Sequence, residues 1–226
     1  DLLQEKNALY GRFAVTIKLN ELNYLDTAKF YPDKTPYDKV AHYAVFGGSP
    51  FVNQALRPTA TLRENIVSTI VNPVSAVYLY ASQLLLSDYS VKINAERIFA
   101  VIGNGKKRYS EIEDKLDVKK TGNLAKQMKP LRDLEIISRN YPINKLNDSK
   151  KSTFEINDNL LRFYFTFIYK NASALQVLGA EAFYDEYVAP TLTDFISRRF
   201  EGICRDYFSL QVRSGKLKGV RNIGSY

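Results

Sequence analysis

The feature of this sequence that most constrains its fold is the order of hydrophobic patterns between residues 94 and 157. Apolar side chains at helical spacing predict a first helix over residues 95–102, which stops at a Gly-Asn-Gly turn. A second short helix is predicted at Ser110–Leu116, with Ser110 as its N-cap. A third helix is expected to begin near Thr121. Three short helices in succession restrict this part of the chain to a small helical unit.

The face of the third helix and the segments that follow it complete the pattern. Leu124, Met128 and Leu131 recur at helical spacing and predict the buried face of that helix. Two strands are predicted next, at residues 136–141 and 152–156, joined by a polar loop. Three helices followed by a β-hairpin is the order of a winged helix-turn-helix.

The segments on either side of this unit are predicted to be mostly helical. Residues 20–93 contain amphipathic runs at Pro36–Phe46, Leu62–Val71 and Ala76–Leu86, separated by prolines, which predict a bundle of short helices. An aromatic run over residues 163–169 predicts a buried helix. The predicted fold class is therefore mainly α with a small β-wing; the start of a C-terminal α/β domain is implied only by the family resemblance described in the next paragraph.

Two short motifs stand before and inside the helical bundle. The helix at Pro36–Phe46 ends at Gly47-Gly48-Ser49-Pro50, a strong helix stop. The run Leu9-Tyr10-Gly11-Arg12 precedes a short alternating strand. With the winged-helix pattern, this order of segments resembles the archaeal-type ATPases, a STAND/AAA+ branch with a P-loop domain, a helical lid, a winged helix and a PD-(D/E)xK nuclease-like domain.

The resemblance covers nearly the whole chain and rests on order and spacing. It implies four parts: the tail of a P-loop domain at residues 1–19, the lid at 20–93, the winged helix at 94–157, and the beginning of the nuclease-like domain at 158–226. The missing P-loop domain of the same protein is then an expected partner. The runner-up interpretation is a stand-alone winged-helix transcriptional regulator that binds DNA.

The resemblance also implies where nucleotide contacts would lie. Gly48 and Pro50 would pack against the adenine base, and Arg12 would recognise charge near the γ-phosphate. A solvated loop arginine is the alternative for Arg12. ATP and magnesium are expected cofactors of the intact protein, but the sequence has no Gly-x-x-x-x-Gly-Lys-Ser/Thr loop. We therefore expect no ATP hydrolysis by this chain alone, and assign neither a catalytic residue nor a metal site.

Charge is unevenly distributed along the chain. The net charge is +8; residues 94–151 hold 14 basic and 8 acidic side chains, and residues 197–226 hold 7 and 2. Such segregation is typical of proteins that bind an anionic partner such as DNA, although basic faces are often merely solvated. The residues predicted to contact DNA, on the third helix and in the hairpin, are Lys119, Lys120, Thr121, Asn123, Lys126, Gln127 and Arg139. The alternative for this unit is a packing or sensor module.

The remaining features concern location. The chain opens without a basic-then-apolar leader, and its longest apolar tract, residues 66–86, is interrupted by polar side chains. We therefore expect a cytoplasmic protein with no membrane partner. The single cysteine, Cys204, is predicted to be a small buried residue, and one cysteine excludes a disulfide framework within the chain.

Overall fold

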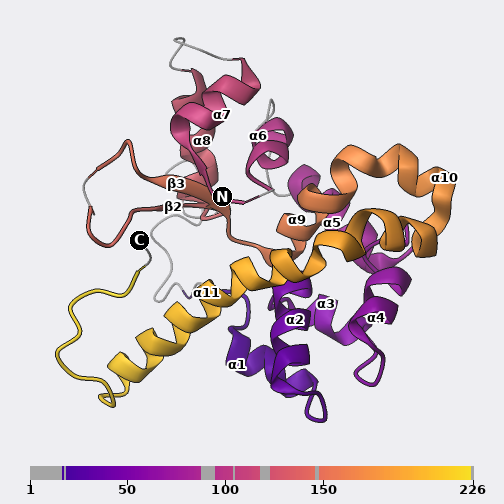
Figure 1. The fold of residues 1–226 in the computed structure, drawn as a ribbon, viewed down its shortest axis with the longest axis horizontal. Helices are drawn as coiled ribbons and strands as arrows, with labels where there is room; N and C mark the ends of the chain where they lie inside the picture. The colour runs from indigo at the N-terminus through magenta and orange to yellow at the C-terminus, as the bar shows by residue number, and fades with distance from the viewer. Residues whose placement is uncertain are drawn as a thin grey trace, which may run out of the picture.

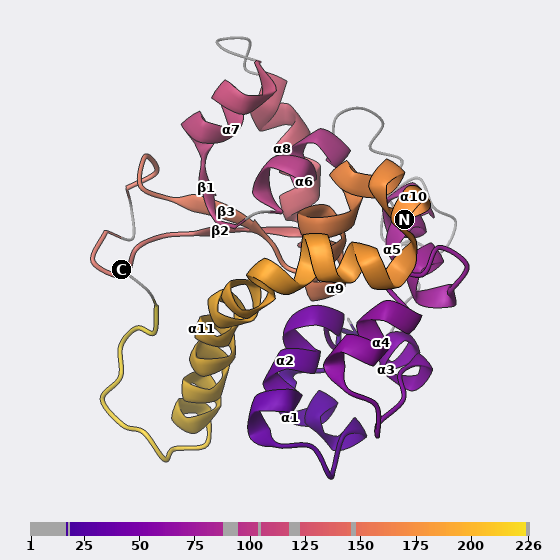
Figure 2. The ribbon, with the colours of Figure 1, turned by 45° about the vertical axis from the view of Figure 1, so that its right-hand side comes forward.

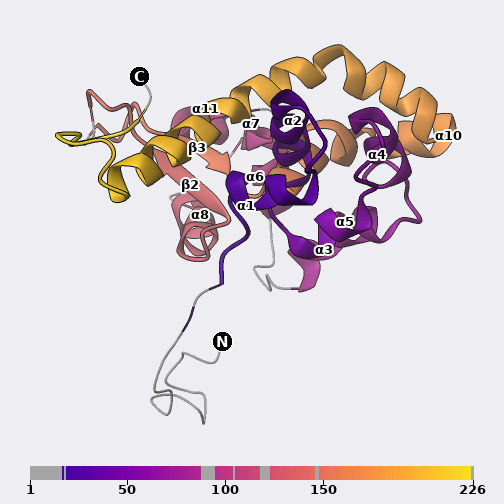
Figure 3. The same ribbon diagram turned by 90° about the horizontal axis from the view of Figure 1, so that it is seen from below.

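The structure, a computed structural model, describes residue 17 and residues 19–87, 95–103, 105–117, 123–145 and 148–224. It confirms a mainly helical fold with one small antiparallel sheet (Figure 1). Seen from below, α8 and the sheet lie towards one end of the molecule, and α4 and α10 lie towards the other (Figure 3).

The first helical part begins with short elements that local capping specifies. The elements are α1 (Tyr24–Thr27), η1 (Ala28–Phe30), α2 (Pro36–Phe46), α3 (Pro50–Ala55), α4 (Leu62–Ser68) and α5 (Ala76–Ser87). Helix α2 starts where the Thr35 side chain accepts a hydrogen bond from the Asp38 amide, and it stops at Gly47, whose φ is +71°. A capping box between Thr61 and Glu64 starts α4.

The winged-helix unit has the predicted order, with one additional strand. Its elements are α6 (Ala95–Ile102), β1 (Lys107–Arg108), α7 (Tyr109–Leu116), α8 (Asn123–Asp133), β2 (Ile137–Asn140) and β3 (Thr153–Ile156). The sheet order is β1-β3-β2, with Arg108 opposite Thr153 and Arg139 opposite Phe154. We call residues 141–152, between β2 and β3, the wing.

The start of α7 corrects the predicted cap. The N-cap residue is Arg108, and Ser110 lies inside the helix as its second residue. The Glu111 carboxylate accepts a hydrogen bond from the Arg108 amide at 2.6 Å. This bond satisfies the first free amide of the helix without a serine cap.

The last part of the described chain is a succession of helices. They are α9 (Asn159–Phe163), the π-helix η2 (Tyr164–Ile168), η3 (Tyr169–Asn171), α10 (Ala172–Phe183), the π-helix η4 (Tyr184–Val188) and α11 (Ala189–Arg213). Figure 2 shows α11 passing between the winged-helix elements and α1 to α4. No strand lies in the described residues from 158 onward, and the four-part division of the chain stays a prediction.

Two hydrophobic cores meet along one segment. The first core combines helices α2 to α5 with α9 to α11, and the second lies inside the winged-helix unit. Residues 159–168 contribute to both: Phe163 and Phe167 are buried in the first core, whereas Leu161 and Phe165 are buried in the second. Because residues 159–168 supply side chains to both cores, the winged-helix unit is packed against the helices of the first core, which are α2 to α5 and α9 to α11.

A buried ion pair reinforces this junction. Glu155 on β3 accepts a hydrogen bond from Arg162 on α9 at 2.8 Å, and both side chains are less than a tenth exposed. Arg162 also donates to the Ile156 carbonyl at 2.8 Å. Burial acts to raise the pKa of Glu155, but the charges of Arg162, Arg199 and Lys106 outweigh burial and hold this pKa below its ordinary value. The carboxylate is therefore ionised at neutral pH.

Candidate nucleic-acid interface

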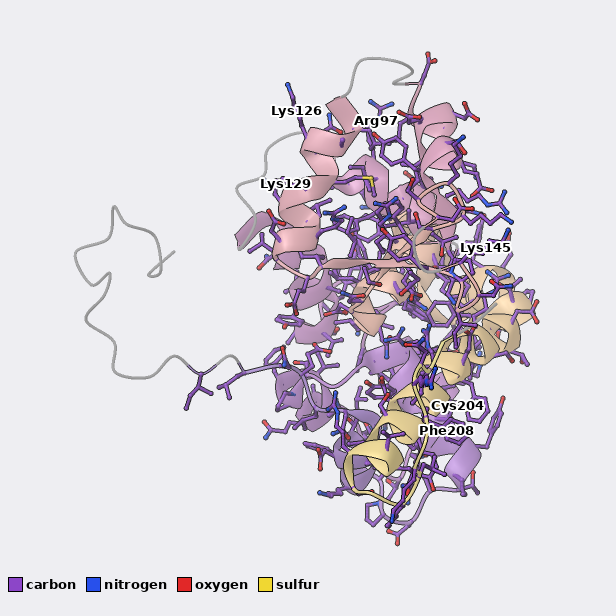
Figure 4. All side chains as sticks on the ribbon, turned by 90° about the vertical axis from the view of Figure 1, so that its left-hand side faces the viewer. Arg97, Lys126, Lys129, Lys145, Cys204 and Phe208 are labelled. Carbon is purple, nitrogen blue, oxygen red and sulfur yellow. The ribbon has the colours of Figure 1, made fainter. Side chains whose placement is uncertain are left out.

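Helix α8 turns an apolar face inward and a basic face outward. Leu124, Met128 and Leu131 are at most 2% exposed, which confirms the predicted inner face. Lys126 and Lys129 are exposed on the other side of the helix, where Figure 4 shows both. The helix thus carries its cations on the surface that a partner can reach.

Gln127 differs from its predicted outward position. The side chain is half-buried, and its Oε1 atom is buried without a hydrogen-bond partner in the described residues. Gln127 follows Leu124 by three positions and precedes Leu131 by four, so helical spacing places it at the edge of the apolar stripe. It cannot read a base edge from this position without a change of rotamer.

The Arg139 side chain on β2 is hydrogen-bonded to residues of the wing. Its Nε donates to Ser152 Oγ at 2.8 Å, and its Nη2 donates to the Ser149 carbonyl at 3.1 Å. The guanidinium also lies over the Tyr141 and Phe154 rings, 5.0 and 5.5 Å from their centroids. Arg139 therefore ties the returning limb of the wing to the sheet, a role that the sequence did not reveal.

A basic groove opens between α7, α8 and the wing. Its volume is about 740 Å³. Apolar atoms of Ala125, Met128 and Phe154 line it, and so do the four cationic side chains of Lys129, Arg132, Arg139 and Lys150, together with Tyr109, Ser110 and Ser149. No Asp or Glu is among the described residues that line the groove. A concave surface with one sign of charge concentrates anions, because its walls focus the field.

Sequence reasoning found only part of this lining. Lys129 and Arg132 stand three residues apart, so they share one face of α8 with Lys126, and this spacing is a readable signal. Lys150 comes from the far limb of the wing, and only the fold brings it to the groove. Ser110, the residue expected to cap α7, supplies a hydroxyl to the same groove.

Several predicted site residues lie outside the described residues. These are Arg12, Lys119, Lys120, Thr121 and the side chain of Asn123. The backbone of Asn123 begins α8.

The two residues expected to touch adenine lie in different surroundings. Gly48 is buried under the segment before α1, where the Leu22 amide donates to the Gly48 carbonyl at 3.0 Å. A Cβ atom on Gly48 would lie 1.9 Å from the Leu22 carbonyl oxygen, so this close approach requires glycine. Pro50 is exposed as the first residue of α3. The chain itself covers Gly48, whereas the ring of Pro50 is open to solvent.

Other predicted features have these outcomes. Cys204 is half-exposed on α11, so the prediction of a buried cysteine is wrong; the residue is visible in Figure 4. Among the described residues, no set of three His, Cys, Asp or Glu side chains is placed to hold a metal ion. The described helices include none with both the length and the apolar character needed to cross a membrane.

Comparisons with known proteins give two likenesses. A model of the family DUF234, described as archaea bacterial proteins of unknown function, matches residues 164–226, which run from η2 through α11 to the end of the chain. An uncharacterized protein of Methanocaldococcus jannaschii is 24% identical over 218 residues, covering 96% of this chain and 48% of that protein. The chain therefore spans about half the length of this relative. No solved structure matches.

Proposed function

We propose that this chain is the DNA-binding and coupling part of an ATP-dependent protein, and that its winged helix holds duplex DNA by the phosphate backbone. The basic groove carries this proposal. Its four cationic side chains and three hydroxyl groups surround a concavity in which no described residue is acidic. Lys, Arg and Ser side chains are the usual partners of phosphate oxygens in protein–DNA complexes.

Recognition of the phosphate backbone is favoured over reading of the bases. Gln127, the amide side chain expected to read adenine, is half-buried, and Arg139 is bonded within the wing. Lys126, Lys129 and Arg132 are exposed cations, which neutralise phosphates without regard to sequence. We therefore propose a weakly sequence-dependent interaction.

The coupling role rests on the joint between the two cores. Residues 159–168 are packed into both cores. A movement of the helices of the first core would therefore be transmitted to the winged helix through this one continuous segment. The ATP site itself belongs, in this proposal, to a P-loop domain outside this chain. The resemblance to archaeal-type ATPases supports that assignment.

The proposal is tested by the affinity of the chain for a short fluorescent DNA duplex. Lys129→Gln/Arg132→Gln removes two exposed charges from the groove. Hydrogen bonds to charged groups contribute about 1.5–3 kcal/mol, so we expect at least about tenfold weaker binding. The matched control is Lys29→Gln/Lys170→Gln, which removes two exposed charges from η1 and η3, outside the winged-helix unit. An equal loss in both variants, or none in the first, would contradict a DNA site in the groove.

A further inference from the structure

The wing brings cations together outside the groove. A series of backbone hydrogen bonds folds it: the Lys145 amide donates to the Pro142 carbonyl at 2.9 Å, the Asp148 amide to the Lys145 carbonyl at 3.0 Å, and the Lys151 amide to the Asp148 carbonyl at 3.1 Å. Lys145 and Lys151 are thus both bonded, through their backbones, to the same residue.

Strand β1 adds a third cation. Arg108 pairs with Thr153, which follows Lys151 by two residues. The bonds of Arg139 to Ser149 and Ser152 hold this limb of the wing in place beside the sheet. The fold therefore fixes the backbone positions from which these exposed cations extend.

Charge in this cluster is unbalanced. Lys145, Arg108 and the carboxylate of Asp148 are among the charges that act on Lys151, and the carboxylate of Glu111 lies at the backbone amide of Arg108. One oxygen of Asp148 already accepts a hydrogen bond from the Lys150 amide at 3.0 Å. The ammonium of Lys145, by side-chain contact and then by its charge, lowers the pKa of Lys151, and the charge of Arg108 lowers it further. An anion between these groups would relieve their mutual repulsion.

We propose that Arg108, Lys145 and Lys151 form a phosphate-binding site at the base of the wing. None of the three lines the groove, so the site is distinct from it. Figure 4 shows Lys145 in the wing and Lys126 and Lys129 on α8 in one view of the molecule. The phosphate belongs either to a DNA backbone or to a free anion. As a DNA contact the site rests on the proposed function; as a phosphate site it does not.

The test uses Lys145→Gln/Lys151→Gln, with Lys29→Gln/Lys170→Gln as the matched control. The first measurement is the affinity for a DNA duplex as a function of salt. Each phosphate contact contributes about 0.9 to the slope of log affinity against log salt, so the wing variant is expected to lose about 1.8 from the slope. The control should keep the slope of the wild type.

The second measurement is a titration with inorganic phosphate at constant ionic strength, followed by NMR of the backbone amides of residues 149–153. We expect the amide chemical shifts to change and reach saturation with phosphate in the wild type and in the control, and to stay unchanged in the wing variant. A wing variant with the wild-type salt slope overturns the inference and leaves the groove proposal standing. If the wild type binds no duplex, the proposed function fails and the phosphate titration alone decides on the wing site. Chemical-shift changes that are lost only in the wing variant uphold the phosphate site. The absence of such changes in the wild type overturns the phosphate site.

Discussion

At the scale of single residues, neighbours on α8 have opposite surroundings. Leu124 is 1% exposed, whereas Lys126 stands in solvent. Truncation of a core leucine removes its burial and leaves a cavity, so Leu124→Ala is expected to lower the free energy of unfolding by about 2–5 kcal/mol. Lys126→Ala should change it by less than about 0.5 kcal/mol. Urea unfolding of both variants measures the difference, and equal effects would show that the helix face is assigned wrongly.

The stability of the junction between the two cores is expected to depend on pH through Glu155. Its pKa in the folded chain lies below the ordinary value, so its contribution to stability is present above the unfolded pKa and is lost as the pH falls through the folded pKa. Glu155→Gln should therefore be less stable than the wild type at pH 7, with a difference that shrinks in acid. Thermal unfolding at a series of pH values tests this, and a stability difference independent of pH would contradict it.

Residues also show where sequence reasoning stopped. The inner face of α8 follows from spacing, because burial obeys the helical period. The half-buried position of Gln127 is consistent with the same spacing, but the polarity of its side chain favours a prediction that it faces solvent. The internal role of Arg139 depends on Ser149 and Ser152 across the wing, and such a long-range pairing leaves no local pattern.

At the scale of elements, the prominent helices were predictable and the smallest pieces were not. Helix α2 begins and ends where proline and glycine place its boundaries. Strand β1 has only two residues, too few to show an alternating pattern. The 25-residue helix α11 carries Pro190 in its first turn, where proline is tolerated because the amide it lacks would have no partner within the helix.

The turn between α2 and α3 makes a prediction about glycine. In Gly48→Ala the new methyl group would collide with the backbone of Leu22, which must then move. Such overpacking typically costs about 1–3 kcal/mol. Gly202→Ala in α11 is the control, because its Cβ would meet only the ends of arginine side chains, at 3.6 Å or more. There alanine should stabilise the helix by up to about 1 kcal/mol. If Leu22 is packed against Gly48, chemical denaturation will show a lower free energy of unfolding for Gly48→Ala and a higher one for Gly202→Ala than for the wild type.

At the scale of the whole molecule, the linear order of segments concealed how they share cores. The sequence predicts a lid, a winged helix and a further domain in succession. In the structure, α9 to α11 complete the same core as α2 to α5, and the winged helix is inserted between them in the chain. A hydrophobic pattern shows which face of a helix is buried but not which helix covers it, so this arrangement could not be read from the sequence.

The chain as a whole is expected to have no ATPase activity. The sequence contains no phosphate-binding loop, and Gly48 is covered by the segment around Leu22. Without charge-assisted bonds to the phosphates, nucleotide binding should be weak. Isothermal titration calorimetry with ATP and magnesium is the measurement, and micromolar affinity for this chain would contradict the expectation.

In the proposed function, the winged helix binds the backbone of DNA through exposed cations. This binding is tested by the affinity of the wild-type chain for two duplexes of unrelated sequence, measured by fluorescence anisotropy over a range of salt concentrations. We predict similar affinities for both duplexes and a linear fall of log affinity with log salt. If Lys126, Lys129, Arg132 and Lys150 each neutralise one phosphate, the slope is about −3.6 or steeper. No binding at low salt, or an affinity independent of salt, would show that these cations do not bind the phosphates of DNA.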